Sequence, residues 1–222
     1  MTPRSPGDVR NRLDFWQALS GACLALFICV HLVLEGSVVL SPSITNGIGW
    51  LLEVTYAAQI AAPLIVLLIL FHFWIAARKM PFRAGELQIF VAHSKALREP
   101  DTYLWLVQVF TAVIILAGAF FHVYTVMTDM PITVAGSAKR LHSGWLLFHA
   151  VFLPSIILHT GIGIYRLAVK FAVCRKSSRD RWRKAVWIGM GCYFALGVCA
   201  LTRVWFILQG RQTVSGDRKG RE

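Results

Sequence analysis

Four histidines stand well inside long apolar runs of the sequence, and each lies in a different run. They occur in the segments FICVHLVL, LILFHFWI, GAFFHVYT and SIILHTGI, as His31, His72, His122 and His159. A polar group inside a membrane span is costly unless it is bonded, so an ionisable residue there is a candidate for function. One such histidine could be satisfied by a nearby carbonyl or hydroxyl. Four of them, on four runs, favour a shared role as ligands, because a neutral imidazole binds metal ions and haem iron.

The runs that carry these histidines are long enough to cross a bilayer as helices. Of 222 residues, 56% are hydrophobic and 15% are charged, whereas soluble domains carry about 25% charged residues. About 20 apolar residues span the hydrocarbon core of a membrane. We therefore predict an all-α integral membrane protein with a single transmembrane domain over residues 1–222. The expected spans are about 15–40, 54–77, 103–127, 144–169 and 185–208, with polar termini at 1–12 and 211–222.

The basic charge of the chain predicts its orientation. There are 23 Lys and Arg residues against 11 Asp and Glu, a net charge of +12. Because these basic residues flank apolar runs, they indicate membrane topology and an anionic lipid surface rather than a nucleic-acid partner. Fifteen fall in the N-terminal arm, the second loop and the fourth loop, against six on the other side. By the positive-inside rule, we expect a cytoplasmic N-terminus and a periplasmic C-terminus in the inner membrane.

The alternating direction of the spans places the four histidines at two depths. His31 and His122 come near the outer ends of their spans, and His72 and His159 lie nearer the inner ends. At 1.5 Å rise per residue, the two depths differ by about 15 Å. Two imidazoles at one depth suit a six-coordinate haem iron, which transfers electrons because no position is left for oxygen. The pattern predicts a helix bundle that encloses two b-type haems; the lack of CxxC and CxxCH motifs argues against iron–sulfur or covalent haem ligation.

A fifth histidine competes for the outer depth. His149 lies ten residues before His159 in the fourth span. Ten residues turn a helix by about 1000°, which leaves His149 roughly 80° from the face of His159. The angle alone does not exclude His149 as the partner of His31 in place of His122.

Segments in the first four spans resemble the di-haem cytochrome b subunit of succinate dehydrogenases and menaquinol:fumarate reductases. The resemblance is carried by LDFWQALSG…FICVH, HFWIAARKMP, DTYLWLVQ…FFHVY and KRLHSGW…LHTGIGIYRLAVK, over about Leu13 to Lys170. The fifth span is similar in character only. The layout is most similar to the five-helix, single-polypeptide anchors of epsilon- and delta-proteobacterial fumarate reductases. The resemblance implies axial pairing of His72 with His159 near the cytoplasm, and of His31 with His122 at the distal haem.

The resemblance also implies which polar residues contact the haem propionates. The contacts to the haem near the cytoplasm correspond to Gln17, Trp105 and Lys170. Ala18 stands where the family has a serine, so one contact is missing. Arg140 corresponds to the contact at the distal haem, although its spacing to the ligand histidine is one residue shorter than in the family.

Menaquinol is the substrate that the resemblance implies, with a glutamate in the first outer loop as the group that takes its protons. That glutamate has no unambiguous counterpart here, and Glu35 and Glu53 are the candidates. Glu35 lies one turn beyond His31 on the same face, although either carboxylate could instead reach the outer interface. The family's glutamate on a transmembrane proton path is Ile157 in this chain, which leaves open whether turnover is electrogenic.

We therefore expect a membrane anchor and electron-transfer subunit. It would oxidise menaquinol and pass electrons through two b haems to an iron–sulfur subunit that feeds an FAD-containing flavoprotein, or run in reverse for succinate oxidation. The chain has no dicarboxylate or flavin site, so it would be an enzyme only as the quinone-reactive subunit of a complex. That complex could itself form a dimer. Two alternatives stay open: a di-haem anchor of another dehydrogenase, and a proton-coupled transporter with a histidine relay.

Overall fold

The computed structural model describes residues 6–81, 83, 85–97, 99–173 and 175–219, and these residues form helices and turns with no strand. Of the expected polar termini, residues 1–5 and 220–222 lie outside the described residues. Only the backbone is described for residues 6–10, 97, 176 and 208–219.

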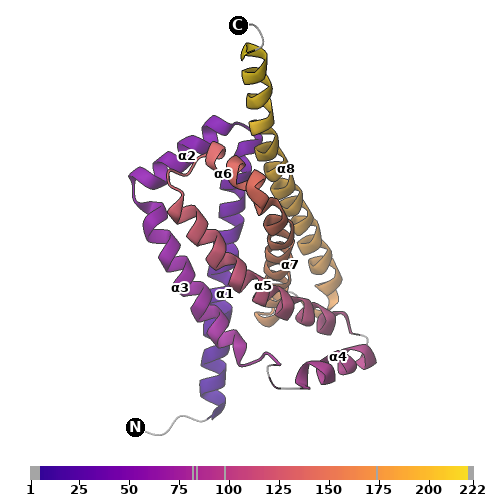
Figure 1. Cartoon of the computed structure of the whole chain (residues 1–222). Coiled ribbons are helices and arrows are strands. Elements are labelled where there is room, and N and C mark those ends of the chain that lie inside the picture. Colours follow the sequence, from indigo (N-terminus) through magenta and orange to yellow (C-terminus); the bar gives the residue numbers. More distant parts are fainter. Residues whose placement is uncertain (1–5, 82, 84, 98, 174, 220–222) are drawn as a thin grey trace.

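In the described part of the chain, five helices are long and apolar enough to cross a membrane, which confirms the predicted fold class and makes this a multi-pass membrane protein. They are α1 (Pro6–Gly36), α3 (Ala57–Ala77), α5 (Pro100–Thr128), α7 (Leu146–Lys170) and α8 (Arg179–Lys219). The start of α1 and the end of α8 lie at opposite ends of the bundle, as an odd number of crossings requires (Figure 1). We call the end where α1 begins the lower end, and the end toward which α8 runs the upper end.

Short helices occupy the connections between the long ones. They are α2 (Pro42–Val54), η1 (Ser37–Val39) and α6 (Val134–Arg140) at the upper end, and α4 (Glu86–Leu97) and η3 (Lys176–Ser178) at the lower end. Local capping explains two of their starts. Ser41 Oγ accepts a hydrogen bond from the Ser43 amide before α2, and Thr133 Oγ1 accepts one from the Gly136 amide before α6.

A break in the backbone separates α6 from α7. The intervening turn, η2 (Leu141–Trp145), contains two residues with non-helical dihedral angles, Ser143 and Gly144. Gly144 has a φ of +102°, a conformation that glycine adopts without the steric cost imposed by a Cβ atom. The break lets the chain change direction as it enters the fourth membrane helix.

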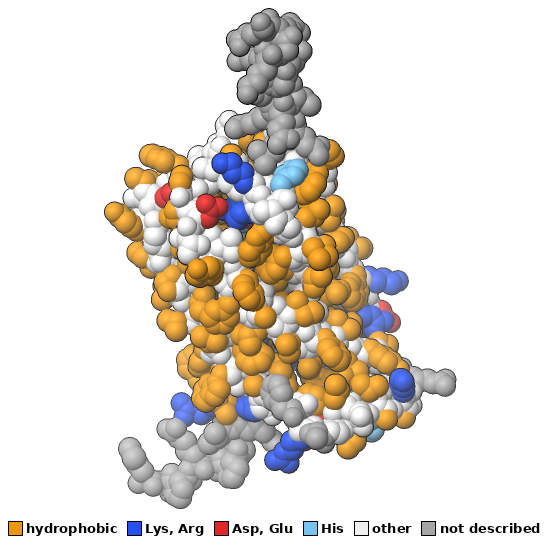
Figure 2. Space-filling view, in the orientation of Figure 1, with side chains coloured by type: hydrophobic (Ala, Val, Ile, Leu, Met, Phe, Trp, Pro, Cys, Tyr) orange, Lys and Arg blue, Asp and Glu red, His pale blue; other side chains and the backbone are white. Residues whose placement is uncertain are grey.

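The four histidine-bearing helices form a closed ring. α1 packs against α3, α3 against α5, α5 against α7 and α7 against α1, whereas α8 lies outside the ring against α1 and α7. Large apolar side chains point away from the bundle, and Leu67, Trp74 and Leu147 are 62%, 70% and 74% exposed. Figure 2 shows apolar side chains over the middle of one face, with charged side chains toward its edges and ends. This surface suits contact with lipid rather than water.

Candidate functional site

A large cavity runs along the inside of the ring formed by α1, α3, α5 and α7. Its volume is about 1080 Å³, and its walls extend from Asp14 and Lys79 at the lower end to Glu35 at the upper end. Pockets that hold one small ligand measure about 300–1,000 Å³, so this cavity exceeds that range. It is lined by all but one of the site residues expected from the sequence, namely His31, His72, His122, His159, Gln17, Trp105, Arg140, Lys170 and Glu35. The exception is Glu53.

Two histidines face each other across the cavity near its upper end, and we call them the upper pair. The ring centres of His31 on α1 and His122 on α5 are 6.1 Å apart, with an angle of 75° between the planes. Two imidazole nitrogens that bond one metal ion from opposite sides, each at about 2.0–2.1 Å, hold the ring centres roughly 6 Å apart. The spacing of the upper pair therefore matches two axial ligands of one metal ion.

His149 lies beside His122, one residue of the upper pair. Its ring centre is 6.3 Å from that of His122, and its Nδ1 atom is 2.8 Å from the Trp145 carbonyl oxygen of its own helix. Among the described aromatic contacts, His31 meets His122 and none joins His31 to His149. The geometry therefore favours His122 over His149 as the partner of His31.

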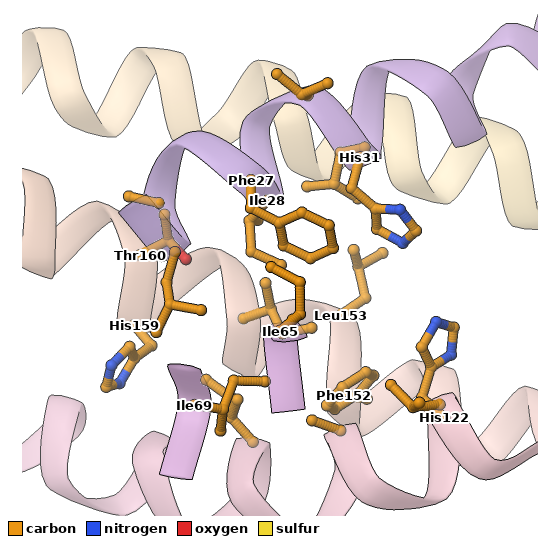
Figure 3. A pocket seen from close by; sticks show the side chains of 18 of the residues that line it. Phe27, Ile28, His31, Ile65, Ile69, His122, Phe152, Leu153, His159 and Thr160 are labelled. Carbon is orange, nitrogen blue, oxygen red and sulfur yellow. The ribbon is translucent and has the colours of Figure 1, made fainter. Parts of the chain in front are cut away.

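The other two histidines, His72 on α3 and His159 on α7, line the cavity at a lower level, and we call them the lower pair. His72 contacts Ser20, which precedes His31 by eleven residues on α1. At 1.5 Å per residue, the two levels are about 16 Å apart. Figure 3 shows His159 on one side of the cavity and His31 and His122 on the other, with an apolar layer between them that includes Phe27, Ile28, Ile65, Ile69, Phe152 and Leu153.

Comparison with known proteins identifies the family. Residues 88–198, half of the chain, match the family model described as the succinate dehydrogenase/fumarate reductase transmembrane subunit. The chain belongs to this family. The fumarate reductase cytochrome b subunit of Helicobacter pylori is 29% identical over 200 residues, which cover 85% of this chain and 78% of that protein. The subunit of the same name from Wolinella succinogenes is 27% identical over 195 residues, with 82% and 76% covered.

The segment of this transmembrane subunit that matches the family model holds one histidine of each pair, His122 and His159. The other two, His31 and His72, precede the matched segment on α1 and α3. The fold brings each of them to the level of a histidine from the matched half, so both halves of the chain are needed to build each level.

The polar side chains at the lower end include one buried acceptor without a partner. Gln17 Oε1 is buried and has no hydrogen-bond partner among the described residues. A buried polar atom left in this state costs free energy, and an amide can rotate to present either its oxygen or its NH₂ group. Nearby, Lys170 Nζ donates a hydrogen bond of 2.5 Å to the Asp14 carbonyl oxygen. The ring of Trp105 packs against that of Phe90 on α4, with 5.0 Å between the ring centres. This set fits an anionic group of a ligand such as a haem propionate.

The upper end of the cavity holds a different set of charges. Arg140 lines the wall, pairs with the Asp129 carboxylate and donates to Ser137 Oγ at 3.0 Å. Its guanidinium therefore lies where it could also meet an anionic group in the cavity.

The structure separates the two candidate glutamates of the quinol site. Glu35 lines the cavity near the upper pair. The Glu53 carboxylate instead accepts a hydrogen bond from the Ile132 amide, and Asn46 on the same face of α2 accepts one from the Val134 amide at 2.8 Å. Glu53 thus helps to hold α2 against the loop that precedes α6.

Four residues at the lower pair were not anticipated from the sequence: Ser20, Gln108, Thr111 and Arg166. Ser20 and Thr111 contact His72 and His159, and the Gln108 carbonyl oxygen also contacts His159. The Gln108 side chain accepts a hydrogen bond of 2.8 Å from Arg166, which lines the cavity. Small polar residues inside apolar spans were a visible signal, but only the rotation of the packed helices shows which histidine each one meets.

Proposed function

We propose that this chain, as a single transmembrane domain, is the membrane anchor and electron-transfer subunit of a menaquinol:fumarate reductase, or of a succinate:quinone oxidoreductase that works in the opposite direction. The observation that carries this proposal is the presence of two histidine pairs at two levels of one cavity. Family membership and relatives named fumarate reductase cytochrome b subunits support it.

Each histidine pair would hold one b-type haem: His31 with His122, and His72 with His159. The roughly 6 Å ring spacing of the upper pair and the common level of the lower pair support these assignments. A haem with two imidazole ligands supplies one-electron transfer, because no coordination position stays open for oxygen.

Polar side chains at the two ends of the cavity would bind the propionates. At the lower end, Lys170 offers a charged donor, Trp105 an indole N–H, and Gln17 an amide whose buried oxygen has no partner among the described residues. At the upper end, the Arg140 guanidinium offers several donors in a fixed plane. These groups would orient each macrocycle and neutralise part of its charge.

Menaquinol oxidation would take place at the upper end, and a carboxylate there would accept the protons. Glu35 supports this role by lining the cavity one turn beyond His31. Glu53 is the second candidate for this role because it lies at the edge of the same region, where its carboxylate accepts a hydrogen bond from the Ile132 amide. These carboxylates are our two candidates for the catalytic base.

An iron–sulfur subunit would dock at the lower end and pass electrons to an FAD-containing flavoprotein. Fifteen of the basic residues lie in the segments expected at that end, which supports a cytoplasmic lower end in the inner membrane. Arg78 and Lys79 lie there at the end of α3, and both pair with Asp14 of α1. The C-terminus would then be periplasmic.

Two other functions are less well supported. An anchor of another dehydrogenase would share the two haems, but the matched family is that of succinate dehydrogenases and fumarate reductases. A transporter with a histidine relay is less well supported because the chain belongs to a family of respiratory transmembrane subunits.

The test is the absorbance spectrum and haem content of the purified protein. We expect a reducible Soret and α band and two b haems per chain by pyridine haemochrome. His93, an exposed residue of α4, provides a control: the His93→Ala variant should keep both haems. A colourless protein, or one with a single haem, would refute the two-level proposal.

A further inference from the structure

The two histidine pairs differ in what contacts their Nδ1 atoms. In the lower pair, His72 Nδ1 is 2.9 Å from Ser20 Oγ, and His159 Nδ1 is 3.1 Å from the Gln108 carbonyl oxygen. The rings of the upper pair instead pack against phenylalanine rings. The ring centres of His31 and Phe27 are 5.4 Å apart, and those of His122 and Phe152 are 6.0 Å apart. Within the described part of the chain, the structure shows no hydrogen bond to either imidazole of the upper pair.

The hydrogen bond of Ser20 determines where the proton of His72 resides. A serine hydroxyl has one hydrogen, and two carbonyl oxygens that can only accept it, those of Trp16 and Gln17, lie 2.8 Å and 3.2 Å from Ser20 Oγ. With its hydrogen given to one of these carbonyl oxygens, Ser20 Oγ offers a lone pair to His72, and the His72 Nδ1 atom then carries a hydrogen and donates it. The Nε2 atom of His72 is then left with a free lone pair, as an iron ligand requires.

The same reasoning holds for His159. A carbonyl oxygen can only accept, so His159 Nδ1 donates to Gln108. Thr111 Oγ1, at 3.3 Å from the same nitrogen, gives its own hydrogen to the Val107 carbonyl oxygen at 2.8 Å. Both residues of the lower pair are thus held as the tautomer that presents Nε2 for bonding.

Close packing keeps His72 against Ser20. Ser20 is only 3% exposed, so water does not replace its hydroxyl as a partner. The next residue, Gly21, leaves room for the imidazole: a Cβ atom built there would lie 3.0 Å from His72 Cε1. The ring therefore lies directly against the backbone of α1.

We propose that Ser20, together with the Gln108 carbonyl group, positions the lower histidine pair and lowers the reduction potential of the haem bound there, independently of the upper haem. This inference rests on the proposed function. A hydrogen bond from Nδ1–H makes the ligating nitrogen more basic, which favours the more positively charged, oxidised iron. Among the described residues nothing bonds the imidazoles of the upper pair in this way, so the bonds of the lower pair contribute to a difference in potential between the two haems. A side-chain substitution can remove the Ser20 hydroxyl, which is 2.9 Å from His72 Nδ1, but not the Gln108 carbonyl group.

The test compares two substitutions of Ser20 with a matched control in the purified protein. Ser20→Ala removes the acceptor, and Ser20→Thr retains a hydroxyl. Ser155→Ala is the control, because Ser155 is also buried (6% exposed) and also bonds the carbonyl oxygen four residues earlier, that of Val151 at 2.7 Å. Redox titration of the α band and low-temperature electron paramagnetic resonance would follow the two haems separately.

We expect Ser20→Ala to raise the midpoint potential of the lower haem and to leave that of the upper haem unchanged. Ser20→Thr should restore the potential, and Ser155→Ala should alter neither haem. Loss of the lower haem in Ser20→Ala but not in Ser20→Thr would equally support the role of the hydroxyl. Two haems with unshifted potentials in Ser20→Ala, an equal shift of both, or loss of the lower haem from both Ser20 variants would overturn the inference. Absence of haem from the unsubstituted protein would instead refute the proposed function.

Discussion

Gly21→Ala is the substitution that tests most directly how tightly His72 of the lower pair packs against α1. The added Cβ atom would lie 3.0 Å from His72 Cε1, whereas ordinary contacts begin at 3.4 Å. Either the imidazole or the helix must therefore move by about 0.4 Å. Since Ser20 is on the same helix, the 2.9 Å bond between its hydroxyl and His72 Nδ1 would lengthen beyond the usual limit of about 3.2 Å.

The cost of this displacement can be estimated from the bond it breaks. A hydrogen bond contributes about 0.5–1.5 kcal/mol net, which corresponds to a roughly 2- to 10-fold weaker hold on the lower haem. Ligand geometry in a binding site tolerates displacements of about 0.5 Å, so we expect weakened binding rather than complete loss. The upper haem, about 16 Å away along the helices, should be unaffected.

Haem transfer to an excess of apomyoglobin, followed at the Soret band, would measure this effect. The matched control is Gly191→Ala on α8, because no atom lies within 4 Å of the Cβ built there. Replacing glycine by alanine stabilises a helix by about 1 kcal/mol at either position. A difference in haem release between the two variants therefore does not come from this general stabilisation. If Gly21→Ala released its haems no faster than Gly191→Ala, the close contact between His72 and α1 would not govern haem binding.

Two further predictions concern the ligands and the quinol site. His72→Ala should lose only the lower haem and His122→Ala only the upper, as counted by pyridine haemochrome and paramagnetic resonance. His149→Ala should keep both, and loss of a haem from that variant alone would reassign the upper ligand. Glu35→Gln and Glu53→Gln should each be assayed for menaquinol oxidation in the assembled complex with haem content measured in parallel. At least one should lose most of its activity while keeping both haems, and full activity in both would exclude these carboxylates as the base.

The membrane helices were predictable because hydropathy and length are properties of contiguous sequence. A run of about 20 apolar residues has few stable alternatives to a membrane-spanning helix. The short helices α2, α4 and α6 were not anticipated, because 7 to 13 residues of mixed polarity give no comparable signal. Their starts depend on local caps such as Ser41 and Thr133.

Part of the candidate site could also be inferred from the sequence. His31, His72, His122 and His159 stand out as polar residues in apolar runs, and the alternation of span direction predicts their two depths. Depth along the membrane follows from counting residues, because each helical residue rises by a constant 1.5 Å.

The rotation of each helix about its own axis was decided only by the tertiary structure. That rotation depends on how side chains from distant segments pack, and it directs Ser20 toward His72 and brings His122 into contact with both His31 and His149. It also puts Glu35 in the cavity wall, while Glu53 bonds the Ile132 amide. The amino-acid sequence alone determined which residues enter the membrane and at what depth, because hydropathy and helical rise act along one dimension. Which of those residues meet was decided by packing in three dimensions, because contacts between helices join positions that are tens of residues apart.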